Sequence, residues 1–184
     1  MCVLDALFDI YRKTGDSNYI GEPISQVEHA QQAAWLAERA GSRPGLILAA
    51  FFHDIGHLCA PEGTPQMDGL GVLEHERVGA ERLRASGLDG DLAELVELHV
   101  QAKRYLCCRT EGYYQQLSEA SKGTLSFQGG PMSPSEAEQF ESHPLFRDVL
   151  RLRTWDERAK RVDGEGLSLE TLKEMAACYR RESI

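Results

Sequence analysis

Three ionisable residues, His53, Asp54 and His57, interrupt one of the most apolar stretches of the chain, FFHDIGHLCA at residues 51–60. Burying such side chains is unfavourable by several kcal/mol unless each finds a partner. Residues four apart share one face of an α-helix, so we expect His53 and His57 to point the same way with Asp54 beside them. Imidazole and carboxylate groups are ligands for transition metals, so the pattern indicates metal chemistry inside the fold.

The other histidines strengthen this interpretation. Five of the six histidines in the sequence fall within predicted helices, on faces that are mainly apolar. One buried histidine alone is readily satisfied by a backbone carbonyl, but five on four helices favour a metal site at the centre of a bundle. We interpret the sixth histidine, His143, and the pair Cys107–Cys108 as structural. The five are His29, His53, His57, His75 and His99.

The elements that must position these side chains are helical almost throughout, because apolar or small residues recur at helical spacing and no alternating strand pattern is present; a loop rich in proline and glycine is expected at residues 60–71. Ser25 and Glu28 predict a capping box, and Ser133 or Ser135 and Ser168 are expected to cap later helices. The sequence thus predicts an all-α helical bundle. The predicted helices span residues 1–15, 24–41, 43–59, 73–87 and 89–108, a short helix followed by an irregular loop in 111–132, one or two helices in 133–160, and a last helix at 168–181.

Composition limits the classes of protein that are compatible with the sequence. A chain of 184 residues predicts a single domain over residues 1–184, and its net charge of -9 argues against general affinity for nucleic acid or an anionic membrane. No segment has the apolar length of a membrane span or the pattern of a signal peptide. Five cysteines without CxxC spacing indicate neither a disulfide framework nor a zinc ribbon, so we expect a cytoplasmic protein. The sequence leaves the oligomeric state open.

The order of the candidate ligands resembles the HD-domain signature, which has a lone histidine, an adjacent histidine–aspartate pair and a distant aspartate. Here these are His29, His53–Asp54 and, in LRLRTWDERAK, Asp156. Beyond this signature the chain is similar to the small HD-domain di-iron oxygenases of organophosphonate degradation, relatives of myo-inositol oxygenase. The segments that carry the resemblance are YIGEPISQVEHAQQAA, FFHDIGH, DGLGVLEHERVGAERL, HVQAKRYLC, SKGTLSFQGGPMS and LRLRTWDERAK.

The resemblance implies an HD-domain helical bundle with a dinuclear metal site at its centre. Asp54 is the carboxylate that directly follows a histidine ligand, so it can bridge two metals roughly 3.5–4 Å apart. The remaining implied ligands divide between the two metals, with His29, His53 and Asp156 on one and His75 and His99 on the other.

The ligand types leave the metal open, since four histidines and two carboxylates suit iron, manganese or zinc. The resemblance implies two iron ions in a mixed-valent Fe(II)/Fe(III) state, with dioxygen as co-substrate. It also implies that Tyr19 coordinates the second iron until substrate displaces it, and that Glu22 then binds the cationic end of the substrate. Spacing alone makes His57 a metal ligand, whereas the resemblance places it beside the metals, facing the substrate.

An anion pocket is the second half of the predicted site. Lys103 lies one helical turn after His99, and Arg153 lies three residues before Asp156, so each shares a helix face with a ligand. The planar fork of an arginine suits phosphonate oxygens. Ser121 and Thr124 are expected to supply hydroxyl donors from a loop; solvated surface charge is the alternative for the two basic residues.

These expectations combine into one predicted activity, a dioxygenase reaction that cleaves a carbon–phosphorus bond. The expected substrate is a small 1-hydroxy-2-amino- or 1-hydroxy-2-trimethylammonio-ethylphosphonate, and the products are phosphate and glycine or glycine betaine. Two alternatives remain open at this point. One is an HD-domain phosphohydrolase that acts on a nucleotide or another phosphate ester through a metal-bound water. The other is a non-catalytic, metal-stabilised bundle that serves as a binding module.

Overall fold

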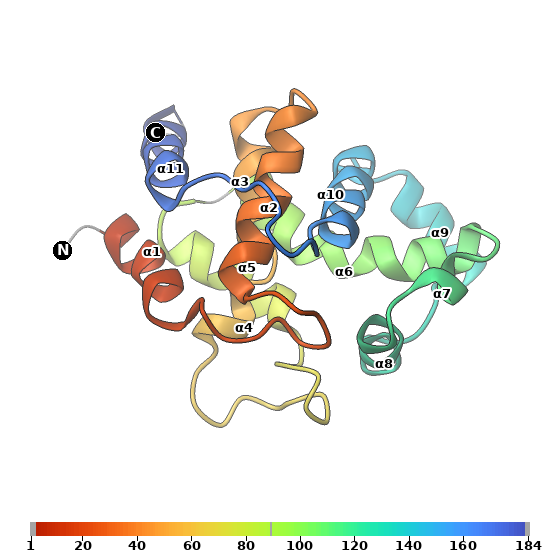
Figure 1. Ribbon diagram of the computed structural model, residues 1–184. Helices are drawn as coiled ribbons and strands as arrows, with labels where there is room; N and C mark the ends of the chain where they lie inside the picture. Colours follow the sequence, from red (N-terminus) through yellow and green to blue (C-terminus); the bar gives the residue numbers. More distant parts are fainter. Residues whose placement is uncertain (1–2, 89, 183–184) are drawn as a thin grey trace.

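The computed structural model describes residues 3–88 and 90–182, so the expected helix starts at residues 1 and 89 lie outside the described residues. The described part of the chain is helical, with isolated β-bridges in place of strands, and the all-α prediction is confirmed (Figure 1). None of these helices has the length and apolarity needed to cross a bilayer. They are α1 (Val3–Thr14), α2 (Gln26–Arg39), α3 (Pro44–Phe52), α4 (Gly56–Cys59), α5 (His75–Ala85), α6 (Asp91–Arg109), α7 (Tyr113–Gln116), α8 (Glu119–Phe127), α9 (Pro134–Glu141), α10 (Phe146–Arg158) and α11 (Leu169–Glu182).

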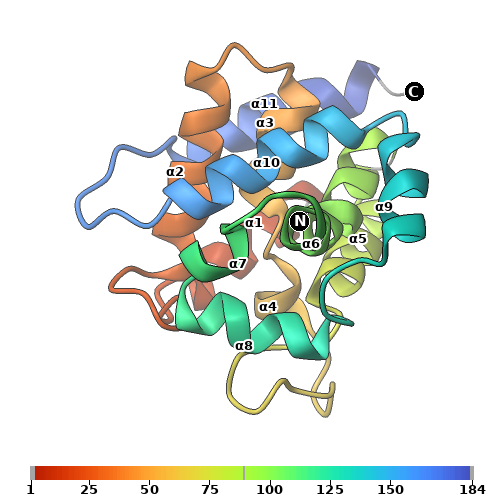
Figure 2. The same ribbon diagram turned by 90° about the vertical axis from the view of Figure 1, so that its right-hand side faces the viewer.

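Helix α3 is the centre of the bundle and packs against α2, α6, α10 and α11. Every residue from Gly45 to Phe52 is buried, as expected for a helix that is apolar all round. Helices α1 and α11, from opposite ends of the chain, pack together on one side (Figure 1), and α7, α8 and α9 lie on the other. Helix α10 packs against α2 and α6 (Figure 2).

The segment 43–59 is not the single helix that the sequence predicted. It divides into α3 and α4, separated by a turn in which Ile55 N–H donates to the Phe52 carbonyl at 3.0 Å and His57 N–H to the Asp54 carbonyl at 3.0 Å. These bonds span three residues, so the chain is wound more tightly here than in an α-helix. A Cβ on Gly56 would lie 1.9 Å from the His75 carbonyl oxygen, so the break lets the backbone rest directly on the start of α5.

The segment after Leu117 also differs from the prediction, which made it an irregular loop. Residues 119–127 form helix α8, and the Ser118 side chain caps it by accepting a hydrogen bond from Ser121 N–H. A Cβ on Gly123 would lie 2.5 Å from Leu70, so the glycine allows α8 to approach the loop before α5 closely. As a result Ser121 and Thr124 project from a helix and not from a loop.

Predicted helix caps agree with the structure at three positions. Ser25 and Glu28 form the expected capping box at the start of α2. Ser133, rather than Ser135, caps α9, and Ser168 accepts a hydrogen bond from Thr171 N–H at 3.1 Å at the start of α11. These caps fix where the ligand-bearing helix α2 begins and how the last helices are placed.

Candidate metal centre

Two histidine pairs face each other across Asp54. His29 from α2 and His53 from the end of α3 have their Nε2 atoms 3.1 Å apart, and His75 and His99, from α5 and α6, have theirs 3.2 Å apart. All four rings are buried. Four segments that are distant in the sequence therefore bring four imidazole nitrogens to one place.

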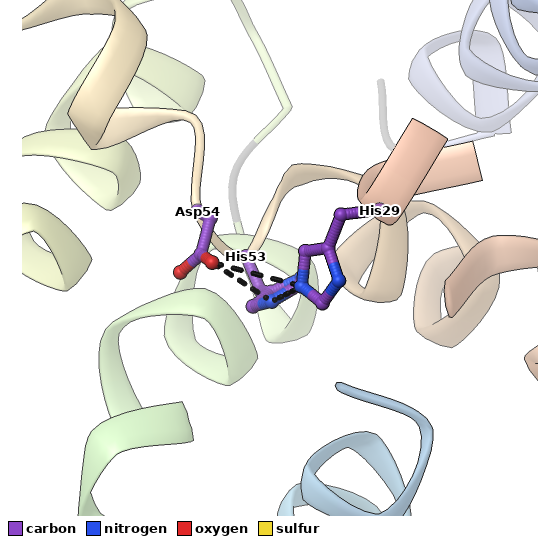
Figure 3. Close-up of side chains that lie close together, drawn as sticks. All are labelled: His29, His53 and Asp54. Atoms are coloured by element: carbon purple, nitrogen blue, oxygen red, sulfur yellow. Dashed lines mark hydrogen bonds and ion pairs between the residues drawn. The ribbon is translucent and has the colours of Figure 1, made fainter. Parts of the chain in front are cut away.

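Asp54 offers one carboxylate oxygen to each pair. Its Oδ2 lies 3.3 Å from His53 Nε2 and 3.7 Å from His29 Nε2, as Figure 3 shows. Its Oδ1 lies 3.3 Å from His75 Nε2 and 3.5 Å from His99 Nε2. Burial opposes a charged carboxylate here, yet the neighbouring His53 keeps the pKa of Asp54 well below its usual range. An ionised carboxylate in this position is suited to joining two cations.

Asp156 completes the first pair from the opposite side. Its Oδ1 lies 3.4 Å from His29 Nε2 and 3.7 Å from His53 Nε2, while its Oδ2 accepts a hydrogen bond from Arg153 Nη1. Burial acts to raise the pKa of this carboxyl, but the guanidinium of Arg153 holds it well below its usual value. Asp156 is thus fixed as a carboxylate whose free oxygen points at the two imidazoles.

The donor chemistry fits metal ions. Nδ1 of His29 lies 2.8 Å from the Ala159 carbonyl and Nδ1 of His53 lies 2.8 Å from the Ala50 carbonyl, so in each ring Nδ1 carries a hydrogen and Nε2 is the atom that faces the other ring and the carboxylates. Burial opposes a charged ring here, but the Asp54 carboxylate raises the pKa of His53 well above its usual value, so the two Nε2 atoms 3.1 Å apart hold a cation between them: a proton when no metal is bound, or a metal ion that replaces it. A backbone carbonyl on the far nitrogen is also the usual way to orient a metal-binding histidine.

The second pair has the same character, with one difference. Nδ1 of His99 lies 2.7 Å from the Val96 carbonyl. Nδ1 of His75 instead faces a carboxylate, with Glu76 Oε2 at 3.5 Å, and both atoms are buried without a hydrogen bond. His75, His99 and Asp54 have their ligand atoms within 4.8 Å of one another, as do His29, His53 and Asp54.

Tyr19 lies against the first pair in the loop before α2. Its ring stacks on that of His29, with centroids 3.9 Å apart, and its backbone N–H donates to the Ile24 carbonyl at 2.8 Å. Burial, and then the charge of Asp54, raise the pKa of Tyr19 well above its usual value. The hydroxyl is therefore a phenol when no cation is near, and ionisation requires one.

His57 lies outside both pairs. Its ring stacks on His75 with centroids 4.0 Å apart, and its Nδ1 accepts a hydrogen bond from Val72 N–H at 3.0 Å. Burial and the neighbouring His75 lower its pKa to about 3, so the ring is neutral and Nε2 carries its hydrogen. A protonated Nε2 is a donor, which favours contact with a substrate oxygen over coordination of a metal.

A small cavity of about 70 Å³ is lined by the second pair, His75 and His99, and by both carboxylates, Asp54 and Asp156. Lys103 is buried in its wall and donates to Thr124 Oγ1 at 2.8 Å, which rules out solvated surface charge for this residue. Burial, and then the nearby Arg153, lower the pKa of Lys103 to about 8. Arg153 is buried as well. The predicted site residues that line the cavity are Tyr19, Asp54, His57, His75, His99, Lys103, Ser121, Thr124, Arg153 and Asp156.

Glu22 does not line this inner cavity but an adjoining outer one of about 340 Å³, which shares Ser121, Arg153 and Lys160 with it. Lys160, which the sequence interpretation missed, donates to Glu22 Oε1 at 2.8 Å. Gln128 was missed too; its Oε1 is buried without a hydrogen bond, and the residue lines the inner cavity. Lys160 follows the end of α10 at Arg158, so helical spacing from Asp156 does not mark it.

Comparison with known proteins agrees with the HD-domain resemblance of the sequence. A family model described as the HD domain matches residues 27–126. An uncharacterised protein of Acanthamoeba polyphaga mimivirus is 40% identical over 181 residues, which are 98% of this chain and 83% of the relative. A 1-hydroxy-2-(trimethylamino)ethylphosphonate dioxygenase (glycine-betaine-forming) of Leisingera caerulea is 38% identical, covering 89% of this chain and 83% of the relative. A hydroxymethylphosphonate dioxygenase of Gimesia maris is 39% identical, covering 92% and 82%.

Proposed function

The chain belongs to the HD-domain family, and from that premise we propose that it is a di-iron dioxygenase that cleaves the carbon–phosphorus bond of a small 1-hydroxyphosphonate. The substrate carries an amino or trimethylammonio group on the next carbon, and the products are phosphate and glycine or glycine betaine. Hydroxymethylphosphonate, which the name of the Gimesia maris relative contains, is the simplest member of the same class and lacks the cation.

The observation that carries the proposal is the position of Asp54 between two imidazole pairs in a cavity with a basic wall. His29, His53 and Asp156 would hold one iron ion, His75 and His99 the other, and Asp54 would join them. When bound, a mixed-valent iron pair supplies the redox chemistry with dioxygen and the positive charge that chelates the substrate. Helices from both ends of the described chain pack against α3 and α4, and we take residues 1–184 as one HD domain.

The chain's own residues bind and orient the phosphonate. Arg153 donates through Nε to Tyr113 and Glu157, and through Nη1 to Asp156, so its guanidinium plane is fixed before substrate arrives. Lys103 provides a second cation on the same cavity wall. Two fixed positive groups offset a phosphonate dianion without reorganisation, which is the principal way in which such a pocket stabilises an anion.

The remaining residues control access and hydrogen bonding. Tyr19, whose ring stacks on His29, would be a displaceable ligand of the neighbouring iron until the phosphonate binds, and Glu22 would then receive the cationic end of the substrate. His57 donates a hydrogen bond from its Nε2–H to a substrate oxygen, and Ser121 and Thr124 donate hydrogen bonds from their hydroxyl groups. A phenol stacked on His29 is close enough to the ligand set for that exchange.

The proposal is tested by anaerobic reconstitution with Fe(II), controlled partial oxidation, and a phosphate-release screen over hydroxyphosphonates and nucleotides. We expect release from hydroxyphosphonates only when dioxygen is present. Release from nucleotides without dioxygen would instead identify a phosphohydrolase, and full metal loading without release from any compound would identify a binding module.

A further inference from the structure

An ion pair lies where the inner and outer cavities adjoin. Lys160 Nζ lies 2.8 Å from Glu22 Oε1, and the two side chains are only 19% and 16% exposed. Lys160 lines both cavities and Glu22 the outer one. The carboxylate that the proposed function assigns to the cationic end of the substrate therefore already holds a cation.

Glu22 and Lys160 both lie in segments that contact the candidate metal centre. Glu22 N–H donates to the Tyr19 carbonyl at 3.0 Å, in the loop whose tyrosine ring stacks on His29. Lys160 directly follows Ala159, whose carbonyl orients the His29 ring, and its Nζ lies 5.6 Å from the centre of the Tyr19 ring. The pair is thus positioned by the segments that form the first half of the site, and not by chance contact of two surface side chains.

The other charges around the outer cavity are already engaged with one another. Glu157 accepts hydrogen bonds from Tyr113 and from Arg153, and Arg153 also donates to Asp156. Among the charged residues that line the outer cavity, this leaves Lys160 as the cation that pairs with Glu22.

We propose that Lys160 is a specificity-determining residue, a tethered cation that an ammonium-bearing substrate must displace from Glu22. A tethered group competes at an effective concentration in the millimolar range or above, so the displacement weakens binding of every ammonium substrate. A hydroxyphosphonate without a cation leaves the ion pair intact and does not meet this competition. Lys160 thereby sets the balance between cationic and cation-free substrates. This inference rests on the proposed function and deepens it.

The test compares 2-amino-1-hydroxyethylphosphonate with hydroxymethylphosphonate as ligands of the metal-loaded protein. Dissociation constants are measured by calorimetry under nitrogen, so the readout does not depend on turnover. In Lys160→Met, which removes the charge but keeps an unbranched side chain, we expect the ratio of the two affinities to move about tenfold toward the ammonium compound. Affinity for hydroxymethylphosphonate should stay nearly unchanged.

Three matched variants complete the design. Lys160→Arg keeps a cation beside Glu22 and should keep the wild-type ratio. Lys173→Met removes an equal charge from a distant ion pair with Asp5 and should also keep it. Adding Glu22→Gln to Lys160→Met should abolish the gain for the ammonium compound, and melting temperatures verify that each variant is folded.

The possible results separate the two ideas. An unchanged ratio in Lys160→Met, or equal weakening of both ligands, overturns the role of Lys160 while the proposed function stands. If neither phosphonate binds the wild-type protein or any variant, and none is turned over in air, the proposed function fails and the inference fails with it.

Discussion

Asp54 is the residue on which the dinuclear site depends, because each of its oxygens faces a different histidine pair. Replacing it with alanine should lower bound iron from two equivalents to well below one, since both metals lose a ligand and the charge that holds them together. His99→Ala should preferentially weaken one metal. Asp148→Ala, which removes an acid that pairs with Arg43 at the surface, is the control and should keep two equivalents. Two full equivalents in the Asp54→Ala protein, measured by metal analysis, would refute the dinuclear arrangement.

Glu76 is expected to act as a positioning residue for His75. Three of the four ligand histidines have a backbone carbonyl on Nδ1, whereas Nδ1 of His75 faces the buried Glu76 carboxylate at 3.5 Å. Loss of such a partner typically weakens metal affinity by 10–100-fold. Glu76→Gln should therefore lower the affinity of one metal by about tenfold in a chelator competition. The adjacent, exposed Glu74→Gln is the control, and equal metal affinity in both variants would contradict the role.

Tyr19 offers a spectroscopic prediction. A phenolate on Fe(III) absorbs visible light, so the oxidised resting protein should be coloured and should bleach when a hydroxyphosphonate is added. Tyr19→Phe should lack the band yet retain both metals, because the other ligands are intact. The variant should also lose activity faster in air without substrate, since no side chain would then occupy the open coordination position of the iron. An unchanged spectrum together with unchanged sensitivity to dioxygen would make Tyr19 a packing residue only.

The HD signature and the family resemblance predicted six histidine and aspartate ligands, and the structure brings all six side chains together. Lys160 escaped prediction because its partner Glu22 lies 138 residues away, and a contact of that range has no local signal. Glu76 was missed for a different reason: its contact with His75 follows from the first turn of α5 and from burial, which the residue types do not reveal.

The loop between α4 and α5 positions His57 through Gly71. This glycine has a φ of +96°, and a Cβ on it would lie 2.6 Å from His57 Cε1. Gly71→Ala should displace the His57 ring and lower kcat/KM about tenfold to a hundredfold. Gly63→Ala is a close control, because it has a similar φ of +83° and open space around its Cβ position. Both variants should lose about 1–2 kcal/mol of stability from the left-handed backbone, but only Gly71→Ala should lose activity. Equal kcat/KM values in the two variants would show that His57 does not need this loop.

Elements were predictable where the determinants are local. Ser25 with Glu28, Ser133 and Ser168 mark helix starts, and the structure has caps at these positions. The break between α3 and α4 was not predictable, because it depends on the approach of Gly56 to the backbone of α5. Helix α8 was mistaken for a loop because its glycine and polar residues are typical of loops, while its packing on Leu70 is a tertiary contact.

For the whole molecule, the pH dependence of substrate affinity should reflect Lys103. Its pKa is lowered to about 8 by burial and by Arg153, so its charge is lost as pH rises through this value. KM for a hydroxyphosphonate dianion should therefore rise above about pH 8. Lys103→Arg keeps its charge at these pH values and should show a flat KM over the same range, whereas Lys103→Met should have a raised KM that no longer responds. A rise in KM above pH 8 that persists in Lys103→Arg would assign the titration to another group.

The all-α architecture was predictable because helical periodicity runs through the whole sequence. The arrangement of the helices in the bundle was not predictable, since it depends on which helix faces meet. Helix α3 is buried on all sides, so its apolar pattern does not indicate which helix packs against which face. The two adjoining cavities were not predictable from the sequence either, because segments far apart in the chain line them together: the loop before α2, helices α4 to α8, and α10.

The most direct test of the dioxygenase proposal is the stoichiometry of dioxygen and phosphate, measured together with an oxygen electrode and a phosphate assay on iron-loaded protein. Conversion of 2-amino-1-hydroxyethylphosphonate and dioxygen to glycine and phosphate balances with both oxygen atoms in the products. We predict one dioxygen consumed for each phosphate and each glycine formed. Phosphate released at the same rate under nitrogen, without consumption of dioxygen, would contradict the proposed function.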